Sequence, residues 1–382
     1  HSGGIFRTTF SISFRRFKMT CKNVTPLKLI TPSSKTPQTL FILIMPVTIL
    51  VSGASGFIAQ HIVRLLISKG YNVIGTVRSA QKGERLKSNL SSKQFTYEIV
   101  PDISLPHAFD AVVQNHPEAT IFLHTASPFH YKASDIEKEL LLPAVNGTIN
   151  ALSAIKKHGP QIRSVVVTSS YVAMWNYARF YDPTHTDTET LWNPISWEEG
   201  KVDSEQGYYA LKTFAEKAAW DFYNSEKLTF DLNFVNPVLV YGPQAFDSEV
   251  SPELNASSEM INQLLKLGFE AKIPNFSSVF VDVRDVAKAH IAAFEKGLSG
   301  ERLLLYSSKF TNQEIIDIVN DNFMELKKRL PAGNPGSRAL AISKICTIDD
   351  SRTRQILGSE RIGLKSSVID TVRQILENTK KL

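Results

Sequence analysis

Residues 47–59 read Val-Thr-Ile-Leu-Val-Ser-Gly-Ala-Ser-Gly-Phe-Ile-Ala, and this stretch decides the fold. Its first part, Val47–Ser52, is a short run of β-branched and apolar residues, which is typical of a buried strand. Two glycines follow, and apolar residues then recur at helical spacing until Gly70, a plausible end of the helix. Tyr71–Val77 again has the composition of a strand. The stretch therefore predicts a strand, a tight turn, a helix and a second strand within about 30 residues.

The same alternation continues as far as residue 235. Further strands are expected at 96–100, 120–124, 164–168 and 229–235, and helices at 135–158 and 208–222. Strands that alternate with helices predict an α/β fold, a Rossmann-type doubly wound parallel sheet with helices on both faces. Beyond about Gly242 the pattern becomes mostly helical, which predicts a smaller lobe over the edge of the sheet. There the segment 280–294 should begin extended and become helical, with Asp285 as its N-cap.

The turn Gly53-x-x-Gly56-x-x-Ala59 has small residues at the three places where a dinucleotide site needs them. Gly53 permits a tight turn, Gly56 lets the backbone approach a pyrophosphate, and Ala59 lets the helix pack close to the strand. The helix N-terminus adds free N–H groups and a partial positive charge for the phosphates. A glycine-rich turn alone is weak evidence, but its place between strand and helix predicts a dinucleotide site.

The end of the second predicted strand indicates the type of cofactor. A site that prefers NAD usually has an acidic residue there, whereas this chain has Arg78, then Lys82, and no acid before Glu84. Arg78 can form paired hydrogen bonds to a 2′-phosphate, so we expect NADPH. The alternative is that Arg78 is a solvated residue at a helix start. Asp102 could meet the adenine edge.

A second group of residues has the spacing of a centre for acid catalysis. Ser170 ends an apolar strand, and Tyr208 and Lys212 follow 38 and 42 residues later, one helical turn apart. A nearby ammonium stabilises a phenolate and lowers the pKa of the phenol, so Lys212 would help Tyr208 to protonate a carbonyl oxygen that Ser170 holds. Tyr209 competes for this role, but it lies three residues from Lys212 instead of four.

These motifs together resemble the extended short-chain dehydrogenase/reductase family, in its dihydroflavonol-reductase-like branch, and most of all the fungal NADPH-dependent methylglyoxal and carbonyl (isovaleraldehyde) reductases. The matching stretches are VSGASGFIAQHIV, GTVRS, IVPDIS, LHTASPF, LLLPAVNGT, VVTSSY, YYALKTFAEKAAW, VNPVLVYGPQ and FVDVRDVAKAH. They run from about Val47 to the C-terminal helices. The resemblance implies an enzyme that transfers hydride from NADPH to the carbonyl of small aldehydes, ketones or 2-oxoaldehydes, giving alcohols.

The resemblance also assigns residues to the site. The catalytic residues carry over to Ser170, Tyr208 and Lys212. Cofactor contacts carry over to Gly53, Ser55, Gly56, Phe57, Ile58, Arg78, Lys82, Asp102, Tyr208, Lys212, Pro237, Val240 and Ser257. The substrate pocket would be lined by Phe129, Tyr171, Trp175 and Tyr241. Many relatives relay protons through an Asn in the long helix before the catalytic strand. This chain has Ala144 there and Asn146 in another register, so water or the ribose hydroxyl would serve instead.

The remaining expectations concern organisation and surroundings. We expect a leader or artefact without fixed structure at 1–44, a Rossmann domain at 45–241 to which 278–300 returns, and a substrate-binding lobe at 242–277 and 301–382. The whole chain has a net charge of +6, but residues 1–44 carry seven basic and no acidic residues, so the rest of the chain has a net charge of −1. This nearly neutral charge argues against a nucleic-acid surface. With two cysteines and no metal-ligand spacing among nine histidines, we expect a cytoplasmic protein without metal, or a mitochondrial one if 1–44 is a transit peptide.

Two other functions remain open from the sequence. Related sugar epimerases and dehydratases keep NAD tightly bound, although Arg78 argues for a dissociable NADPH. A non-catalytic NADPH-sensing protein on the same fold would typically lose the tyrosine or the lysine, and this chain retains both. The fungal relatives suggest a monomer or a homodimer. We expect no membrane association, because no apolar run approaches the roughly 20 residues that span a bilayer.

Overall fold

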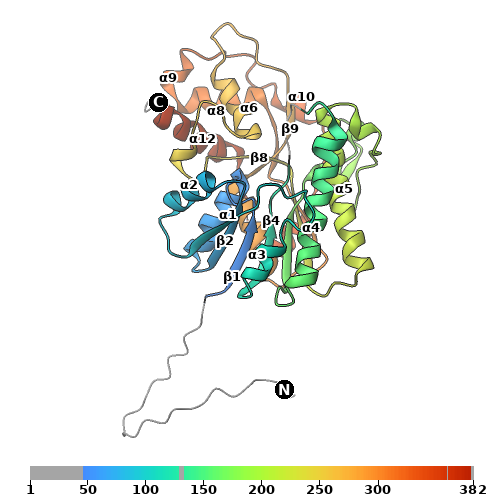
Figure 1. Cartoon of the computed structure of the whole chain (residues 1–382). Coiled ribbons are helices and arrows are strands. Elements are labelled where there is room, and N and C mark those ends of the chain that lie inside the picture. Colours follow the sequence, from blue (N-terminus) through green and yellow to red (C-terminus); the bar gives the residue numbers. More distant parts are fainter. Residues whose placement is uncertain (1–45, 129–132, 359, 380–382) are drawn as a thin grey trace, which may run out of the picture. The chain divides into compact units, whose positions relative to one another are not determined.

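A seven-stranded parallel sheet with the strand order β10-β7-β5-β4-β1-β2-β3 forms the centre of the computed structural model (Figure 1). The strands are β1 (Thr48–Ser52), β2 (Asn72–Val77), β3 (Phe95–Ile99), β4 (Ala119–His124), β5 (Ser164–Thr168), β7 (Asp231–Pro237) and β10 (Arg302–Leu305). The structure describes residues 46–128, 133–358 and 360–379, so the expected leader at 1–44 lies outside the described residues.

Helices cover both faces of this sheet. They are α1 (Phe57–Ser68), α2 (Ala80–Leu90), α3 (Asp110–Asn115), α4 (Leu142–His158, after a π-helical turn at Glu137–Leu141), α5 (Ser204–Ser225) and α7 (Val283–Glu295). Helices α1 and α7 share one apolar core with the sheet, whereas α3, α4 and α5 share another with its opposite face. Figure 1 shows α4 and α5 side by side. The predicted doubly wound α/β fold is confirmed.

A smaller lobe with its own apolar core follows β7. It has a three-stranded sheet in the order β11-β9-β8. Its elements are β8 (Leu239–Tyr241), α6 (Ala256–Leu265), β9 (Ser277–Asp282), β11 (Ser308–Thr311), α8 (Asn312–Asn322), α9 (Met324–Lys327), α10 (Arg338–Ile342) and α12 (Leu364–Thr379). One fully buried side chain from each of five of these elements lies at the centre of the lobe's core: Tyr241, Phe280, Phe310, Ile315 and Val368. This lobe is mostly helical, as predicted.

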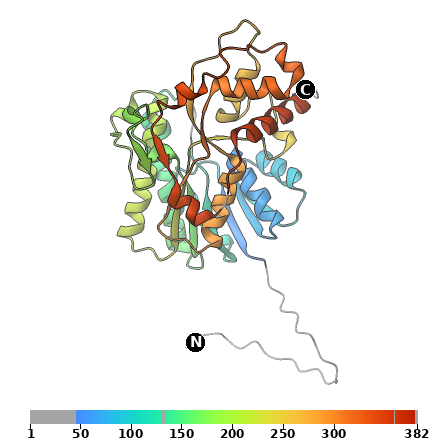
Figure 2. The ribbon, with the colours of Figure 1, turned by 180° about the vertical axis from the view of Figure 1, so that it is seen from behind.

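The C-terminal part of the chain crosses between the two regions more often than expected. Strand β10 was expected in the lobe, but it pairs with β7 in the large sheet, because its three leucines are buried there. Further on, β12 (Thr347–Asp349) pairs with β6 (Thr186–Thr188), and α11 (Ser351–Leu357) packs near β10. Seen from behind, this segment runs back beside the large sheet (Figure 2). Residues 302–305, which were expected in the lobe, therefore belong to the large sheet.

The segment 280–294 also differs from the expectation in detail. Its strand β9 belongs to the lobe's sheet, while its helix α7 packs on α1. The N-cap is Asp282, whose carboxylate accepts a hydrogen bond from the Arg284 N–H, so the predicted N-cap Asp285 is wrong. Asp285 lies in the first helical turn and accepts from the Ile362 N–H instead. The helix starts earlier because Asp282 is the last strand residue and is already in the extended conformation that a cap requires.

Candidate active site

The turn between β1 and α1 is built around Gly53. This residue has φ +65°, and a Cβ there would lie 2.9 Å from the Cα of Ala126, so only glycine fits. The Gly53 N–H donates to Thr76 Oγ1 at 3.2 Å, and the Ala54 N–H donates to the Thr76 carbonyl at 2.9 Å. Helix α1 begins directly after Gly56, and in the described part of the chain no side chain caps it. The first turn of α1 therefore leaves backbone N–H groups for an anion.

A cavity of about 240 Å³ opens over this turn. Its lining residues are Gly53, Ser55, Gly56, Thr76, Val77, Arg78, Lys82, Val100, Ile103, Thr125, Ala126 and Ser127. The structure thus brings five of the predicted cofactor contacts together, including both basic residues after β2. Glu84, the first acid after that strand, accepts a hydrogen bond from the Tyr97 hydroxyl at 2.7 Å. A glycine cradle, an uncapped helix and two cations in one cavity fit a dinucleotide with an additional phosphate.

The other predicted cofactor contacts lie on elements around this cavity. Phe57 and Ile58 form the start of α1. Asp102 is exposed, and its carboxylate accepts from the Ser104 N–H and hydroxyl at 2.8 and 2.7 Å, so it closes a local turn. The last three are Pro237 at the end of β7, Val240 in β8 and Ser257 in the first turn of α6. They mark the path from the large sheet into the lobe, and their contact with a cofactor stays a prediction.

Ser170 and Tyr208 meet at the carboxyl end of β5. Ser170 has extended backbone and begins the short 3₁₀ turn Tyr171–Ala173. Helix α5 is capped by Asp203, whose carboxylate accepts from the N–H groups of Glu205 and Gln206. The helix therefore begins one turn before Tyr208, not at it. The Tyr208 hydroxyl donates to Ser170 Oγ over 3.4 Å, so the structure brings the predicted acid and its serine together.

Lys212 lies one turn beyond Tyr208, and its ammonium donates to the Thr168 carbonyl over 3.5 Å. Burial lowers the pKa of Lys212 to about 8, although the nearby Glu216 carboxylate opposes this shift. The competing Tyr209 donates its hydroxyl to Glu205, and burial together with that carboxylate raises its pKa. A phenol with a raised pKa is a poorer acid, so the geometry favours Tyr208 as the proton donor.

A small cavity of about 20 Å³ lies behind these residues, lined among others by His124, Thr148, Ser169, Lys212 and Glu216. Burial lowers the pKa of His124 to about 3, so the imidazole is neutral, with Nδ1 2.9 Å from Ser52 Oγ. Sequence reasoning missed the buried Thr148 and Glu216 as parts of this site.

The long helix offers no side chain at the expected relay position, since Ala144 is buried and Asn146 is exposed. Thr148 instead reaches the cavity that Lys212 lines. The missed Glu216 could have been found from its spacing, because it follows Lys212 by one helical turn within YYALKTFAEKAAW.

The aromatic residues expected in the substrate pocket have different surroundings. The Tyr171 hydroxyl donates to the buried Asp187, and burial raises its pKa. Tyr241 is fully buried in the core of the lobe. Trp175 is almost buried, with its ring 5.5 Å from that of Tyr171. Phe129 lies outside the described residues. Tyr171 and Tyr241 therefore pack as core residues, and a contact of any of the four with substrate stays a prediction.

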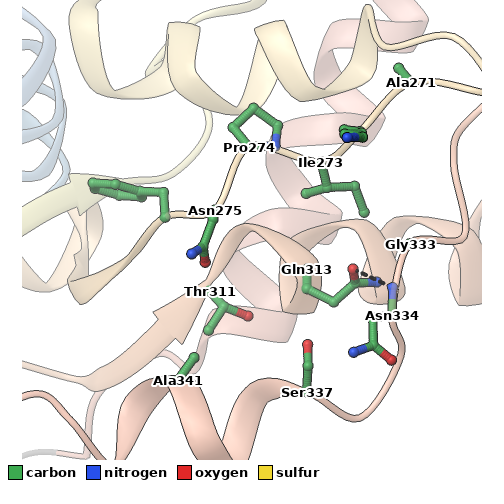
Figure 3. Close-up of a pocket in the computed structure, with 12 residues that line it drawn as sticks. Ala271, Ile273, Pro274, Asn275, Thr311, Gln313, Gly333, Asn334, Ser337 and Ala341 are labelled. Carbon is green, nitrogen blue, oxygen red and sulfur yellow. Dashed lines mark hydrogen bonds between the residues drawn. The ribbon is translucent and has the colours of Figure 1, made fainter.

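A separate hollow of about 410 Å³ lies in the lobe, between the segment 271–276, the start of α8 and the segment 333–341 (Figure 3). There the Gln313 side-chain oxygen accepts from the Asn334 N–H at 2.9 Å, which Figure 3 marks. Among the described residues that line this hollow, none belongs to the predicted site.

The described residues contain no group of three or more His, Cys, Asp or Glu side chains that could hold a metal ion. In the same part of the chain, no helix has the length and apolar character needed to cross a membrane.

The doubly wound sheet and the glycine turn after β1 are those of the extended short-chain dehydrogenases/reductases, a class of oxidoreductases. The model of the NAD dependent epimerase/dehydratase family matches residues 49–305, and the chain belongs to this family.

Relatives with named activities are similar over almost their whole length. The NADPH-dependent methylglyoxal reductase GRE2 of Saccharomyces cerevisiae is 45% identical over 336 residues, which cover 86% of this chain and 98% of GRE2. GRP2 of Candida albicans is 53% identical over 336 residues, covering 86% of this chain and 98% of the relative. The crystal structure of Gre2 from Candida albicans in complex with NADPH has a TM-score of 0.85 at 49% identity, covering 87% of this chain and 99% of that one.

Proposed function

We propose that this protein is an NADPH-dependent reductase that transfers hydride to the carbonyl carbon of small aldehydes, ketones or 2-oxoaldehydes, giving alcohols. The observation that carries the proposal is the contact of the Tyr208 hydroxyl with Ser170 Oγ, one helical turn from the buried Lys212. The similarity to the methylglyoxal reductase GRE2 supports the same reaction. The family model is named after epimerases and dehydratases, whereas GRP2 and GRE2, at 53% and 45% identity, are named as methylglyoxal reductases.

The residues of the glycine-turn cavity would hold the cofactor. Backbone N–H groups at the start of α1 would bind the pyrophosphate, and the cations Arg78 and Lys82 in the same cavity would bind the 2′-phosphate. NADPH, when bound, supplies the hydride. Its nicotinamide end would have to reach Ser170 past Thr125–Ser127, which follow β4 between the two sites and line both cavities in part.

Each residue of the catalytic group has a separate task. Ser170 Oγ donates a hydrogen bond to the carbonyl oxygen of the substrate and holds it beside Tyr208. The Tyr208 hydroxyl donates its proton to that oxygen as negative charge develops there. The Lys212 ammonium, which a pKa of about 8 keeps mostly protonated at pH 7, stabilises the phenolate that remains. The phenolate then regains a proton from solvent, which completes the cycle.

We further propose that the enzyme works in the cytoplasm as a monomer or homodimer. The small number of cysteines, two in 382 residues, supports a reducing compartment.

The test is the loss of nicotinamide absorbance when the protein is mixed with a carbonyl compound and either NADPH or NADH. Methylglyoxal, isovaleraldehyde and an aryl ketone would form the panel. We expect oxidation of NADPH that is at least about tenfold faster than oxidation of NADH. NADPH binding without oxidation by any member of a broad carbonyl panel would contradict the proposal and favour a sensing protein.

A further inference from the structure

Glu216 is a buried carboxylate one turn beyond Lys212 on α5. Its side chain has no exposed area, and together with Lys212 it lines the small cavity behind the catalytic group. A carboxylate removed from water must be paired and hydrogen-bonded to remain charged. The groups that hydrogen-bond to Glu216 therefore indicate the role of this carboxylate.

Three side chains donate to this carboxylate, two from strands and one from the residue that follows a strand. Arg302 in β10 donates through Nε to Oε1 at 2.5 Å. Ser169, directly after β5, donates its hydroxyl to Oε2 at 2.5 Å. Asn236 in β7 donates its side-chain N–H to the same oxygen at 2.8 Å. The carboxylate thus ties α5 to the ends of two strands next to Ser170.

Two of these partners also donate to backbone carbonyls at Ser170 and after it. Asn236 also donates to the Ser170 carbonyl at 3.1 Å. Arg302 donates through Nη2 to the carbonyl of Ala173, at the end of the 3₁₀ turn that follows Ser170, at 3.4 Å. Because Ser169 precedes the serine, the backbone before, at and after it is connected to one carboxylate.

Arg302 itself is held on its remaining sides. Its Nη1 donates to the carbonyls of Glu189 and Leu191 at 2.8 and 2.6 Å, and its guanidinium lies 3.8 Å from the ring centre of Trp192. Residues 189–192 belong to the loop between β6 and α5. An Arg with a planar fork can make all these contacts at once, whereas Lys cannot.

We infer that Glu216 is a positioning residue for the reaction: through Arg302, Asn236 and Ser169 its carboxylate fixes Ser170 against Tyr208 and Lys212. This inference rests on the proposed reductase function. Glu216 does not touch the reacting atoms, so its removal should lower turnover without weakening NADPH binding. If the ion pair of Glu216 were purely structural, its removal would lower the stability of the protein and leave turnover per folded molecule unchanged.

The matched variants are Glu216→Gln and, on the exposed side of the same helix, Asp221→Asn. Glutamine has the same volume, but its amide nitrogen cannot accept a hydrogen bond, so part of the network is lost. We expect kcat for methylglyoxal to fall at least about tenfold in Glu216→Gln, with NADPH affinity within about twofold of wild type. Glu216→Asp keeps the negative charge on a shorter side chain, so its kcat should lie between those of Glu216→Gln and wild type. Asp221→Asn should behave as wild type.

Two results would overturn the inference. One is a kcat for Glu216→Gln within about twofold of wild type at a temperature where both are folded. The other is a parallel loss of NADPH affinity and kcat, which would indicate a general collapse of the site.

A second measurement does not depend on turnover. With NADPH bound, amide hydrogen exchange over residues 170–175 should be faster in Glu216→Gln than in wild type and Asp221→Asn. Unchanged exchange would refute the positioning role even if no carbonyl substrate were found. Inactive wild type with the expected exchange pattern would instead count against the proposed function and leave the role of Glu216 in holding Ser170 supported.

Discussion

The Tyr208 hydroxyl lies 3.4 Å from Ser170 Oγ, although 38 positions separate the two residues in sequence. The contact exists because β5 ends at Thr168 in the middle of the parallel sheet and α5 passes over that edge. Two hydroxyls at this distance can both reach one carbonyl oxygen, which is the geometry that proton donation with hydride transfer needs.

Replacement of the acid should separate chemistry from binding. Tyr208→Phe removes the proposed proton donor and keeps the ring, so we expect kcat to fall by about 10²-fold or more with NADPH affinity nearly unchanged. Tyr209→Phe is the control, because its hydroxyl bonds to Glu205 and not to Ser170. Steady-state kinetics and NADPH fluorescence titration measure both effects. Equal losses in the two variants would argue against Tyr208 as the acid.

Replacement of the cation after β2 should change the choice of cofactor. Arg78→Asp removes the proposed charged hydrogen-bond donor to the 2′-phosphate and offers a carboxylate to a ribose hydroxyl instead. We expect the ratio of kcat/KM for NADPH over NADH to fall about 10- to 100-fold. Arg78→Lys should keep most of the preference. A ratio that does not move in Arg78→Asp would rule out the assignment of the 2′-phosphate to this residue.

The glycine turn should tolerate no side chain. Gly53→Ala combines a left-handed φ of +65° with a Cβ 2.9 Å from the Ala126 backbone, which also lines the cofactor cavity. We expect NADPH affinity to fall at least about tenfold and the free energy of unfolding to fall by about 1–3 kcal/mol. Gly70→Ala is the matched control, since Gly70 has φ +89° with nothing within 4 Å of an added Cβ. It should lose stability alone, and a similar loss of NADPH affinity there would make the effect at Gly53 indirect.

The buried Lys212 should make the stability depend on pH in a defined direction. Its pKa is about 8 in the folded protein against a usual value of 10.5. Between these values the unfolded chain binds more protons than the folded one, so this group's contribution to stability rises with pH from 8 to 10.5. The gain amounts to about 3 kcal/mol when the shift is converted at 1.36 kcal/mol per unit.

The measurement compares urea unfolding of the cofactor-free wild type and Lys212→Met at pH 7.5, 9 and 10. As the pH rises, the unfolding free energy of wild type should increase relative to that of Lys212→Met, because the methionine has no proton to lose. Parallel pH profiles would show that Lys212 titrates as it does in the unfolded chain.

The sequence by itself determined the alternating strands and helices, the glycine turn and the catalytic spacing, because each of these is a local pattern. The predicted strand 164–168 is observed at the same residues, and Gly53 and Gly56 form the predicted turn. Tyr208 and Lys212 need only one helix to lie on a common face. Patterns within one element depend on backbone geometry, which neighbouring residues largely dictate.

Only the tertiary structure decided the features that join distant parts of the chain. Strand β10 belongs to the large sheet because it pairs with β7, and no local signal distinguishes that place from the lobe. The same holds for Arg302, whose partner Glu216 lies 86 positions away, and for Tyr171 and Tyr241, whose side chains are buried in apolar cores. Such contacts depend on how whole elements pack, and the residues that take part carry no periodic pattern between them.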